Sequence, residues 1–272
     1  MAVIAGVAGS GKSSLMECFC QQFPDEVVYI NQKNIGISLR STPGTYMGVS
    51  DDVRKLFAKE TKGGLSMFTF NGKGGCPVCG GKGVIVSNMA FMDPVETVCE
   101  ACGGLRYSPE ALYYKVGGLN IAEVMDLTAR KAAERFAGTS IERKLLPLIQ
   151  VGLGYVHLNQ GLSTLSGGEL QRLKLASYLG SDSKVFILDE PTDGLHVEDI
   201  RHIIGLFDKM VEQGNSIFLI EHNLDILKAS DYVIELGPAG GRMGGELLFR
   251  GRPIEMLHSE HSVTRPYLEA DL

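Results

Sequence analysis

The sequence predicts an α/β fold with a phosphate-binding loop near its start and a small cysteine-containing module inserted later in the chain. Three features carry this prediction: a glycine-rich loop after a short apolar run, an acidic pair that ends a second apolar run, and two CxxC pairs between them. Short apolar runs bounded by polar turns are typical of strands buried in a parallel sheet. The sheet core is therefore expected to combine both ends of the chain, with the inserted module between them.

The composition is that of a globular protein large enough for one α/β domain and a smaller insert. The chain has 272 residues, of which 44% are hydrophobic and 21% are charged. No apolar stretch reaches the roughly 18 residues that a membrane helix needs, and the N-terminus does not read as a signal peptide. A cytoplasmic protein without a membrane partner is therefore expected. The net charge of −6 gives no global support to nucleic-acid binding.

A strand is predicted at residues 2–5, followed by a loop and a helix that match GxxxxGK[ST] in the strand–loop–helix context that this motif requires. The glycines allow backbone N–H groups to converge on phosphates at the start of the helix. Lys12 is expected to reach the β- and γ-phosphates of ATP, and the Ser13 hydroxyl to ligate Mg²⁺. The expected nucleotide-binding residues of this loop are Gly6, Gly9, Ser10, Gly11, Lys12, Ser13 and Ser14.

A central strand is predicted at residues 185–188 because this run is continuously apolar, and it ends at Asp189 and Glu190. An acidic pair in that position can divide its work: Asp189 holds Mg²⁺ through water, and Glu190 polarises the attacking water. Another apolar strand, at residues 217–220, ends before His222, which is expected to contact the γ-phosphate.

Residues 165–169 read LSGGE and precede a helical pattern at residues 170–179. A serine and two glycines at a helix start offer a hydroxyl, free N–H groups and the positive end of the helix dipole to an anion. LSGGE followed closely by ILDEP is the signature of ABC ATPases, and Gln32, after a strand at residues 27–30, fits their Q-loop. Since one phosphate loop already holds nucleotide, the signature is expected to cap nucleotide on a homodimer partner or a second cassette-bearing chain. Its expected contacts are Ser166, Gly167, Gly168 and Glu169.

Four cysteines form two CxxC pairs whose spacing is that of a structural zinc site. They are Cys76, Cys79, Cys99 and Cys102. Four thiolates leave no position for a catalytic water, so Zn²⁺ is expected to be structural, with an iron–sulfur cluster or a redox dithiol as alternatives. The first pair also fits the CxxCxGxG knuckle of DnaJ-type chaperones, but that motif repeats and has no phosphate loop beside it.

With these motifs the chain resembles the second ATPase half of UvrA, the damage-recognition subunit of bacterial excision repair. The resemblance covers nearly the whole chain, and a zinc module between Q-loop and signature is distinctive of that family. Further landmarks are Arg40-Ser41, Pro43, Thr45-Tyr46, Phe68-x-Phe70-Asn71, Val151-Gly152-Leu153-Gly154-Tyr155, Gly194-Leu195-His196, Glu221-His222-Asn223-Leu224-Asp225 and Leu236-Gly237-Pro238. The resemblance implies an ABC ATPase core at residues 1–32 and 161–272. It also implies a signature and insert subdomain at residues 33–160, with the zinc module at about 68–108.

The chain also departs from the UvrA pattern. UvrA carries two cassettes, whereas this sequence has one set of motifs, begins its phosphate loop at Gly6 and lacks the upstream strands and adenine contact of an ABC core. Lys33-Asn34, Ile37 and Asp193 replace the familiar residues of the family. A paralogue's C-terminal portion or a split-gene product is therefore expected.

The resemblance implies an ATPase that controls binding to duplex DNA, expected to be damaged DNA, in nucleotide excision repair with other excision-repair subunits. Six basic residues and one acidic residue between positions 54 and 92 are the expected phosphate-contacting surface, although a solvated face is the ordinary reading. The basic residues are Arg54, Lys55, Lys59, Lys62, Lys73 and Lys82. Three alternatives stay open: a drug-resistance paralogue, an ATP- and DNA-binding module without useful turnover, and a transporter ATPase subunit.

Overall fold

The computed structural model describes residues 1–31, 38, 40–87, 95–179 and 185–271. The chain forms two compact units, of which unit 1 consists of Met1–Lys33, Gln150–Gly152 and Ser166–Leu272, and unit 2 of Asn34–Ile149 and Leu153–Leu165. The domain division expected from the sequence put residues 161–165 with the sheet core. They lie instead in unit 2, where Leu162 is buried and its N–H donates to the Ser41 carbonyl at 2.9 Å.

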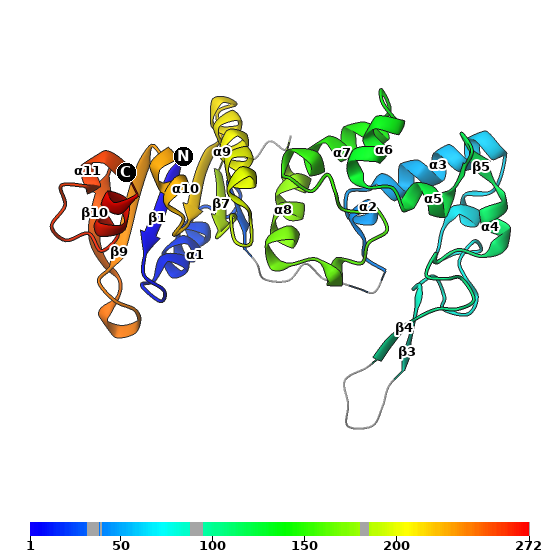
Figure 1. The fold of residues 1–272 in the computed structure, drawn as a ribbon, viewed down its shortest axis with the longest axis horizontal. Helices are drawn as coiled ribbons and strands as arrows, with labels where there is room; N and C mark the ends of the chain where they lie inside the picture. Colours follow the sequence, from blue (N-terminus) through cyan, green and yellow to red (C-terminus); the bar gives the residue numbers. More distant parts are fainter. Residues whose placement is uncertain (32–37, 39, 88–94, 180–184, 272) are drawn as a thin grey trace. The chain divides into compact units, whose positions relative to one another are not determined.

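Unit 1 is built on a six-stranded sheet, counted over the described residues, with the order β10-β9-β1-β8-β7-β2 (Figure 1). All neighbouring strands are parallel except β10, which runs antiparallel to β9. Sequence patterns did not predict β9 and β10, which add an antiparallel edge to an otherwise parallel sheet. The strands are β1 (Ala2–Gly6), β2 (Val27–Ile30), β7 (Val185–Asp189), β8 (Ser216–Ile220), β9 (Tyr232–Gly237) and β10 (Glu246–Gly251).

Helices cover this sheet and close its apolar core. Ile4, Ile187 and Ile220 come from three neighbouring strands and pack with Met16 in one buried cluster. Phe19 packs against the β8 ring of Phe218, with ring centroids 5.8 Å apart. The helices of unit 1 are α1 (Lys12–Gln22), α8 (Gly167–Tyr178), α9 (Val197–Glu212), α10 (Leu224–Ala229), α11 (Pro253–Met256), α12 (Arg265–Ala270) and the 3₁₀ turn η3 (Gly241–Met243).

Unit 2 is mainly helical, with its own aromatic core. Phe57 and Phe68 are fully buried with ring centroids 5.4 Å apart, and Tyr114 meets Phe68 edge-on. Its helical elements are α2 (Pro43–Tyr46), α3 (Val49–Thr61), η1 (Leu65–Phe68), α4 (Pro109–Tyr113), α5 (Ile121–Met125), α6 (Ala129–Arg135), α7 (Ser140–Gln150) and η2 (Leu162–Thr164).

Two small antiparallel hairpins complete unit 2: β3 (Val84–Ser87) with β4 (Val95–Val98), and β5 (Lys115–Val116) with β6 (Leu119–Asn120). Figure 1 shows β3 and β4 projecting from the helical part of this unit. Among the helices that the structure describes, none has the length and apolarity to cross a lipid bilayer.

Candidate nucleotide and metal sites

The phosphate loop and both acidic strand ends meet at one edge of the unit 1 sheet. Strands β1, β8 and β7 are parallel neighbours, so their carboxyl ends lie together. The loop after β1, the Glu221-His222 pair after β8 and Glu190 after β7 therefore share this edge. A cavity of about 290 Å³ lies here, lined by the loop with Ser14 and by the acidic pair that ends β7.

Helix α1 begins at Lys12, directly after the loop. Its N-cap, Gly11, has a left-handed backbone and offers no side-chain oxygen to the first N–H groups of the helix. These N–H groups are therefore left for another acceptor at the positive end of an 11-residue helix. The order of strand, loop and helix that the sequence predicts around this motif is present.

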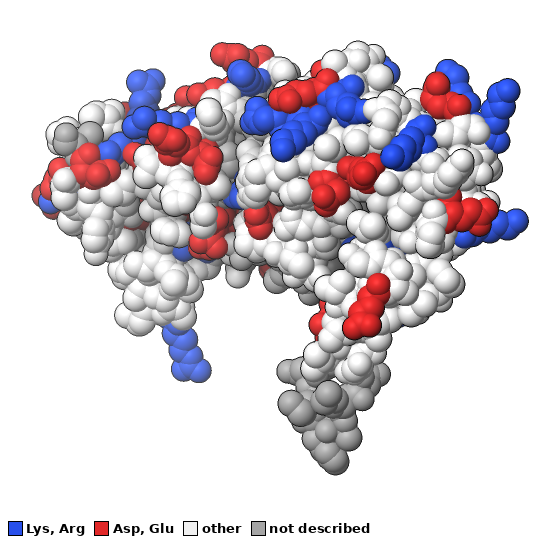
Figure 2. Space-filling view, turned by 45° about the vertical axis from the view of Figure 1, so that its right-hand side comes forward, with Lys and Arg blue, Asp and Glu red and all other residues white. Residues whose placement is uncertain are grey.

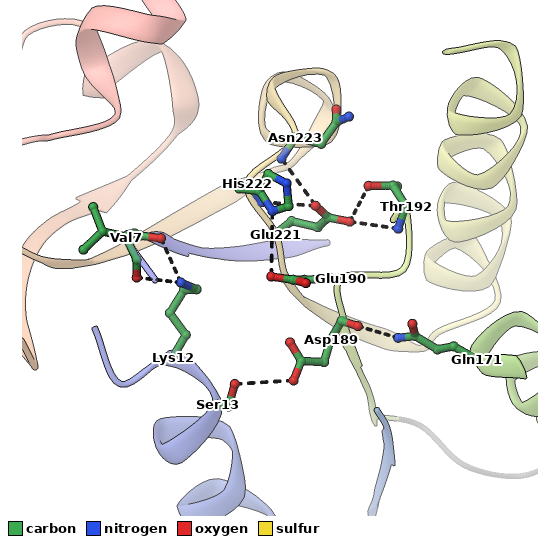
Figure 3. A network of polar contacts seen from close by, with 11 residues as sticks. Val7, Lys12, Ser13, Gln171, Asp189, Glu190, Thr192, Glu221, His222 and Asn223 are labelled. Carbon is green, nitrogen blue, oxygen red and sulfur yellow. Dashed lines mark hydrogen bonds and ion pairs between the residues drawn. The ribbon is translucent and has the colours of Figure 1, made fainter. Parts of the chain in front are cut away.

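The Lys12 ammonium folds back onto the loop. It donates to the carbonyls of Gly6 at 2.8 Å and Val7 at 2.9 Å (Figure 3). Burial lowers the pKa of Lys12, while the nearby carboxylates of Glu190 and Asp189 oppose that shift. These two carbonyls use two of the three N–H donors of the ammonium, which leaves the third for a phosphate oxygen.

Ser13 and Asp189, the two residues expected to ligate Mg²⁺, lie close to each other. The Ser13 hydroxyl lies 3.4 Å from Asp189 Oδ2, and the Tyr29 hydroxyl donates to the same oxygen at 3.3 Å. A hydroxyl and a carboxylate are hard oxygen donors that suit Mg²⁺, which retains several waters. Tyr29 was not identified from the sequence; burial and the Asp189 carboxylate together raise the pKa of its phenol.

Glu190, which lines the cavity, has His222 as its neighbour. His222 Nδ1 lies 3.8 Å from Glu190 Oε1 (Figure 3). The Glu190 backbone is left-handed, with φ of 54°, and its N–H donates to the Ile220 carbonyl at 2.8 Å. The two side chains assigned to water activation and γ-phosphate contact are thus neighbours.

Two buried polar side chains that sequence reasoning did not assign support this edge. Glu221, 1% exposed, accepts hydrogen bonds from Thr192 and from the backbone of the following two residues. Gln171, on α8, donates through Nε2 to the carbonyls of Asp189 at 2.7 Å and Ile30 at 3.2 Å. The residues that Gln171 joins lie far apart in the chain, so no local pattern indicates these contacts.

The signature segment starts α8 with a capping box. Ser166 Oγ accepts from the Glu169 N–H at 3.2 Å, and Glu169 Oε2 accepts from the Ser166 N–H at 2.7 Å. A Cβ on Gly168 would lie 2.7 Å from the Asp193 carbonyl oxygen, so glycine permits this close approach to the segment after Glu190. Ser166 and Gly167 are exposed at the helix start.

One expected nucleotide residue, Gln32, lies outside the described residues, as do the departures at Lys33, Asn34 and Ile37.

The four cysteines come together as one buried cluster in unit 2. Their Sγ atoms all lie within 4.8 Å of one another. Cys76 and Cys99 have sulfurs 4.0 Å apart, and Cys79 and Cys102 have sulfurs 3.8 Å apart. A tetrahedral site with Zn–S bonds of about 2.3 Å requires sulfur separations of about 3.8 Å, so the cluster fits a structural Zn²⁺.

The environment of the cluster favours the thiolate form of Cys79, whereas burial and the neighbouring thiols raise the pKa of Cys102 to about 12. The Gly83 N–H donates to Cys79 Sγ at 3.3 Å. Burial alone would raise the pKa of Cys79, but this N–H and the neighbouring thiols lower it to about 7. A Cβ on Gly81, whose φ is 75°, would lie 1.7 Å from the Phe70 carbonyl oxygen. Arg106 is mostly buried beside the cluster, with its guanidinium 5.7 Å from the centre of the Phe70 ring.

The basic run does not form one uniform surface. Arg54 is half-buried and already engaged, since it pairs with Asp51 and donates to Thr69 Oγ1 at 3.0 Å. Lys82 is half-buried. The remaining lysines of the run are Lys55, Lys59, Lys62 and Lys73, all of which are exposed. Figure 2 shows Lys and Arg side chains interspersed with Asp and Glu on the face it presents.

The parallel sheet, phosphate loop, acidic strand end and LSGGE-capped helix together define an ABC-type ATPase cassette. The family model described as ABC transporter matches residues 1–193. UvrABC system protein A of Lactococcus lactis is 43% identical over 100% of this chain and 32% of its own length. The same-named protein of Staphylococcus aureus is 41% identical over 99% and 32%.

The crystal structure of UvrA2 from Deinococcus radiodurans matches with a TM-score of 0.92 and 39% identity, over 100% of this chain and 37% of that one. The chain belongs to the UvrA family of ABC ATPases. It spans about a third of the length of these relatives, 32% of the first two.

Proposed function

We propose that this chain binds and hydrolyses ATP with Mg²⁺ and uses the nucleotide to control its hold on duplex DNA in damage recognition. One observation carries the catalytic part: Lys12, Ser13, Asp189 and Glu190 line one cavity at the carboxyl edge of the sheet, and His222 lies beside Glu190. These are a phosphate cation, two Mg²⁺ ligands, a base and a γ-phosphate contact, which are the parts that phosphoryl transfer requires.

In this proposal the residues divide their work as follows. Lys12 and the α1 N–H groups bind and neutralise the phosphates. Ser13 and Asp189 would hold Mg²⁺, which would supply neutralisation of the phosphate charge. Glu190 accepts the proton of the attacking water, and His222 orients the γ-phosphate from its place beside Glu190 Oε1.

The signature completes a site on another cassette. Ser166, Gly167 and the positive end of α8 form a second anion-binding helix start in a chain that already has a phosphate loop. Two chains paired head to tail would therefore build two equivalent composite sites about a two-fold axis. A different cassette-bearing chain would serve the same purpose.

The DNA part of the proposal rests on the family and on unit 2. The repair role is proposed from the relatives called UvrABC system protein A, and Ile85 of the projecting β3–β4 hairpin packs against the cysteine cluster. The exposed lysines of the basic run are proposed to contact DNA phosphates. Among them, Lys73 is nearest to the cysteines in sequence. Zn²⁺ in this proposal holds the module and takes no part in hydrolysis.

A mixing experiment tests the composite site. Lys12→Ala keeps a good signature but loses phosphate binding, and Ser166→Arg keeps the phosphate loop but blocks the signature. Neither variant alone should hydrolyse ATP, whereas their mixture should regain part of the parent activity. A mixture that stays inactive while heterodimers form, with an active parent, overturns the composite site. A parent that binds ATP but shows no turnover at any concentration favours a binding module that lacks its partner.

A further inference from the structure

We propose that Glu221 is a positioning residue that holds the catalytic carboxylate Glu190 and the γ-phosphate histidine His222 in a fixed relation for hydrolysis. This inference rests on the proposed ATPase function. It concerns a side chain that reaches neither nucleotide nor Mg²⁺ directly, because Glu221 is buried below the strand end while its neighbour His222 is exposed.

One carboxylate oxygen holds the Glu190 side of the cavity. Glu221 Oε1 accepts the Thr192 N–H at 3.0 Å and the Thr192 hydroxyl at 2.6 Å (Figure 3). Thr192 lies two residues after Glu190 and is itself only 7% exposed. The contact therefore anchors the segment that leaves the sheet through Glu190.

The other carboxylate oxygen holds the histidine side. Glu221 Oε2 accepts the N–H groups of His222 at 3.1 Å and Asn223 at 3.3 Å. The Asn223 side chain then caps α10 by accepting from Asp225 and Ile226. The carboxylate is thus satisfied by four donors from two loops, and each donor is a buried or half-buried group that would otherwise lack a partner.

The anchoring is needed because Glu190 adopts an unfavourable backbone. Its φ of 54° is a left-handed conformation that is unfavourable for a non-glycine residue. Such a conformation persists only where the surrounding structure holds it in place. The Glu190 N–H bond to Ile220 holds one flank, and the Thr192–Glu221 contact holds the other. Release of either flank would move the catalytic carboxylate away from His222.

Glu221→Gln is the direct test, since it keeps the volume but replaces one acceptor oxygen with a donor amide. The remaining oxygen of the amide can accept from the N–H groups of one loop. Its NH₂ group then faces the donors of the other loop and cannot accept from them. We expect the single-turnover rate of ATP hydrolysis to fall at least about tenfold, as for a misplaced reacting group. The ATP dissociation constant, which depends on the phosphate loop, should stay within about threefold of the parent.

Two variants of Thr192 guard against a simple folding defect. Thr192→Val keeps the shape but removes the hydroxyl and should slow hydrolysis in the same direction, whereas Thr192→Ser keeps the hydroxyl and should restore the parent rate. Glu235→Gln is the matched control, because Glu235 is a buried glutamate on the neighbouring part of the sheet that accepts from Thr264 instead. It should leave the hydrolysis rate unchanged.

A double variant distinguishes loss of positioning at Glu190 from a general loss of stability. Adding Glu221→Gln to Glu190→Gln should slow hydrolysis no further, since the positioned base is already gone. A Glu221→Gln chain that hydrolyses at the parent rate, equal rates for Thr192→Val and Thr192→Ser, or full additivity with Glu190→Gln would each overturn the positioning role.

Hydrogen exchange separates this inference from the proposed function. In Glu221→Ala, which removes both acceptor oxygens, the amides of residues 192, 222 and 223 should all exchange faster, with β9 unchanged. If the parent binds ATP without turnover, the proposed hydrolysis is wrong. The exchange measurement still tests whether Glu221 holds both loops. Faster exchange on one loop alone would show that Glu221 does not link the two.

Discussion

Gln171 provides a stability test that is independent of activity. Its Nε2 donates to two backbone carbonyls, while its Oε1 is buried without a partner among the described residues. Gln171→Met removes two hydrogen bonds worth about 1 kcal/mol each, and removal of the unpaired oxygen returns part of that cost. The expected net decrease is about 1 to 2 kcal/mol of unfolding free energy.

The assay is urea unfolding followed by circular dichroism. With a slope of about 2 kcal/mol per molar, the midpoint for Gln171→Met should fall by about 0.5 to 1 M. Gln171→Glu should cost more, about 3 kcal/mol at neutral pH, because it faces a buried charge toward two carbonyl oxygens. Burial raises the pKa of such a carboxyl, so this deficit should shrink as the pH falls and the group becomes a donor.

A half-buried glutamine of unit 2 serves as the control. Gln160 donates to Thr164 Oγ1 at 3.1 Å near the surface, so Gln160→Met should change stability by no more than about 0.5 kcal/mol. If Gln171→Met matches the parent, or Gln171→Glu is no less stable than Gln171→Met, then Gln171 does not hold the two strand ends together.

Three further predictions concern the sites themselves. Lys12→Ala should abolish nucleotide binding measured by equilibrium titration, whereas Glu190→Gln should keep it and slow hydrolysis by roughly 100-fold or more; parent turnover in Glu190→Gln would refute the base assignment. Purified protein should carry about one Zn²⁺ per chain, and Cys99→Ser should lose it and unfold the module without impairing ATP binding. Protein free of zinc and iron after preparation without chelators or oxidants would contradict the site. Charge reversal at Lys73 and Lys82 should weaken duplex binding and lower the slope of log affinity against log salt by about one for each phosphate that is no longer neutralised. An unchanged binding curve would place the DNA surface elsewhere.

Local motifs were sufficient to predict the phosphate loop, the acidic strand end and the cysteine cluster. Each is a short pattern in which the chemistry fixes both residue type and spacing, as at Lys12, Asp189 and Cys76. The parallel strands β1, β7 and β8 were also predicted, because both faces of a buried strand are apolar. Their neighbouring order then placed the motif residues at one edge.

The supporting contacts could not be predicted in the same way. Tyr29 and Asp189 lie 160 residues apart in the chain, and Gln171 and Ile30 lie 141 apart. A lone tyrosine in a strand or glutamine in a helix carries no sign of such a partner. Strand β10 was missed because Glu246–Gly251 lies at the sheet edge, mostly exposed or half-buried, and so lacks a continuous apolar run.

The left-handed backbone of Glu190 lowers the stability of the fold at a residue that hydrolysis requires. Glycine adopts a φ of 54° without steric cost, whereas glutamate does so at the expense of folding free energy. A glycine at this position would therefore relax the turn and remove the carboxylate at once. Selection for thermal stability alone would favour glycine at this position. A glutamate here therefore provides the catalytic carboxylate at the expense of stability.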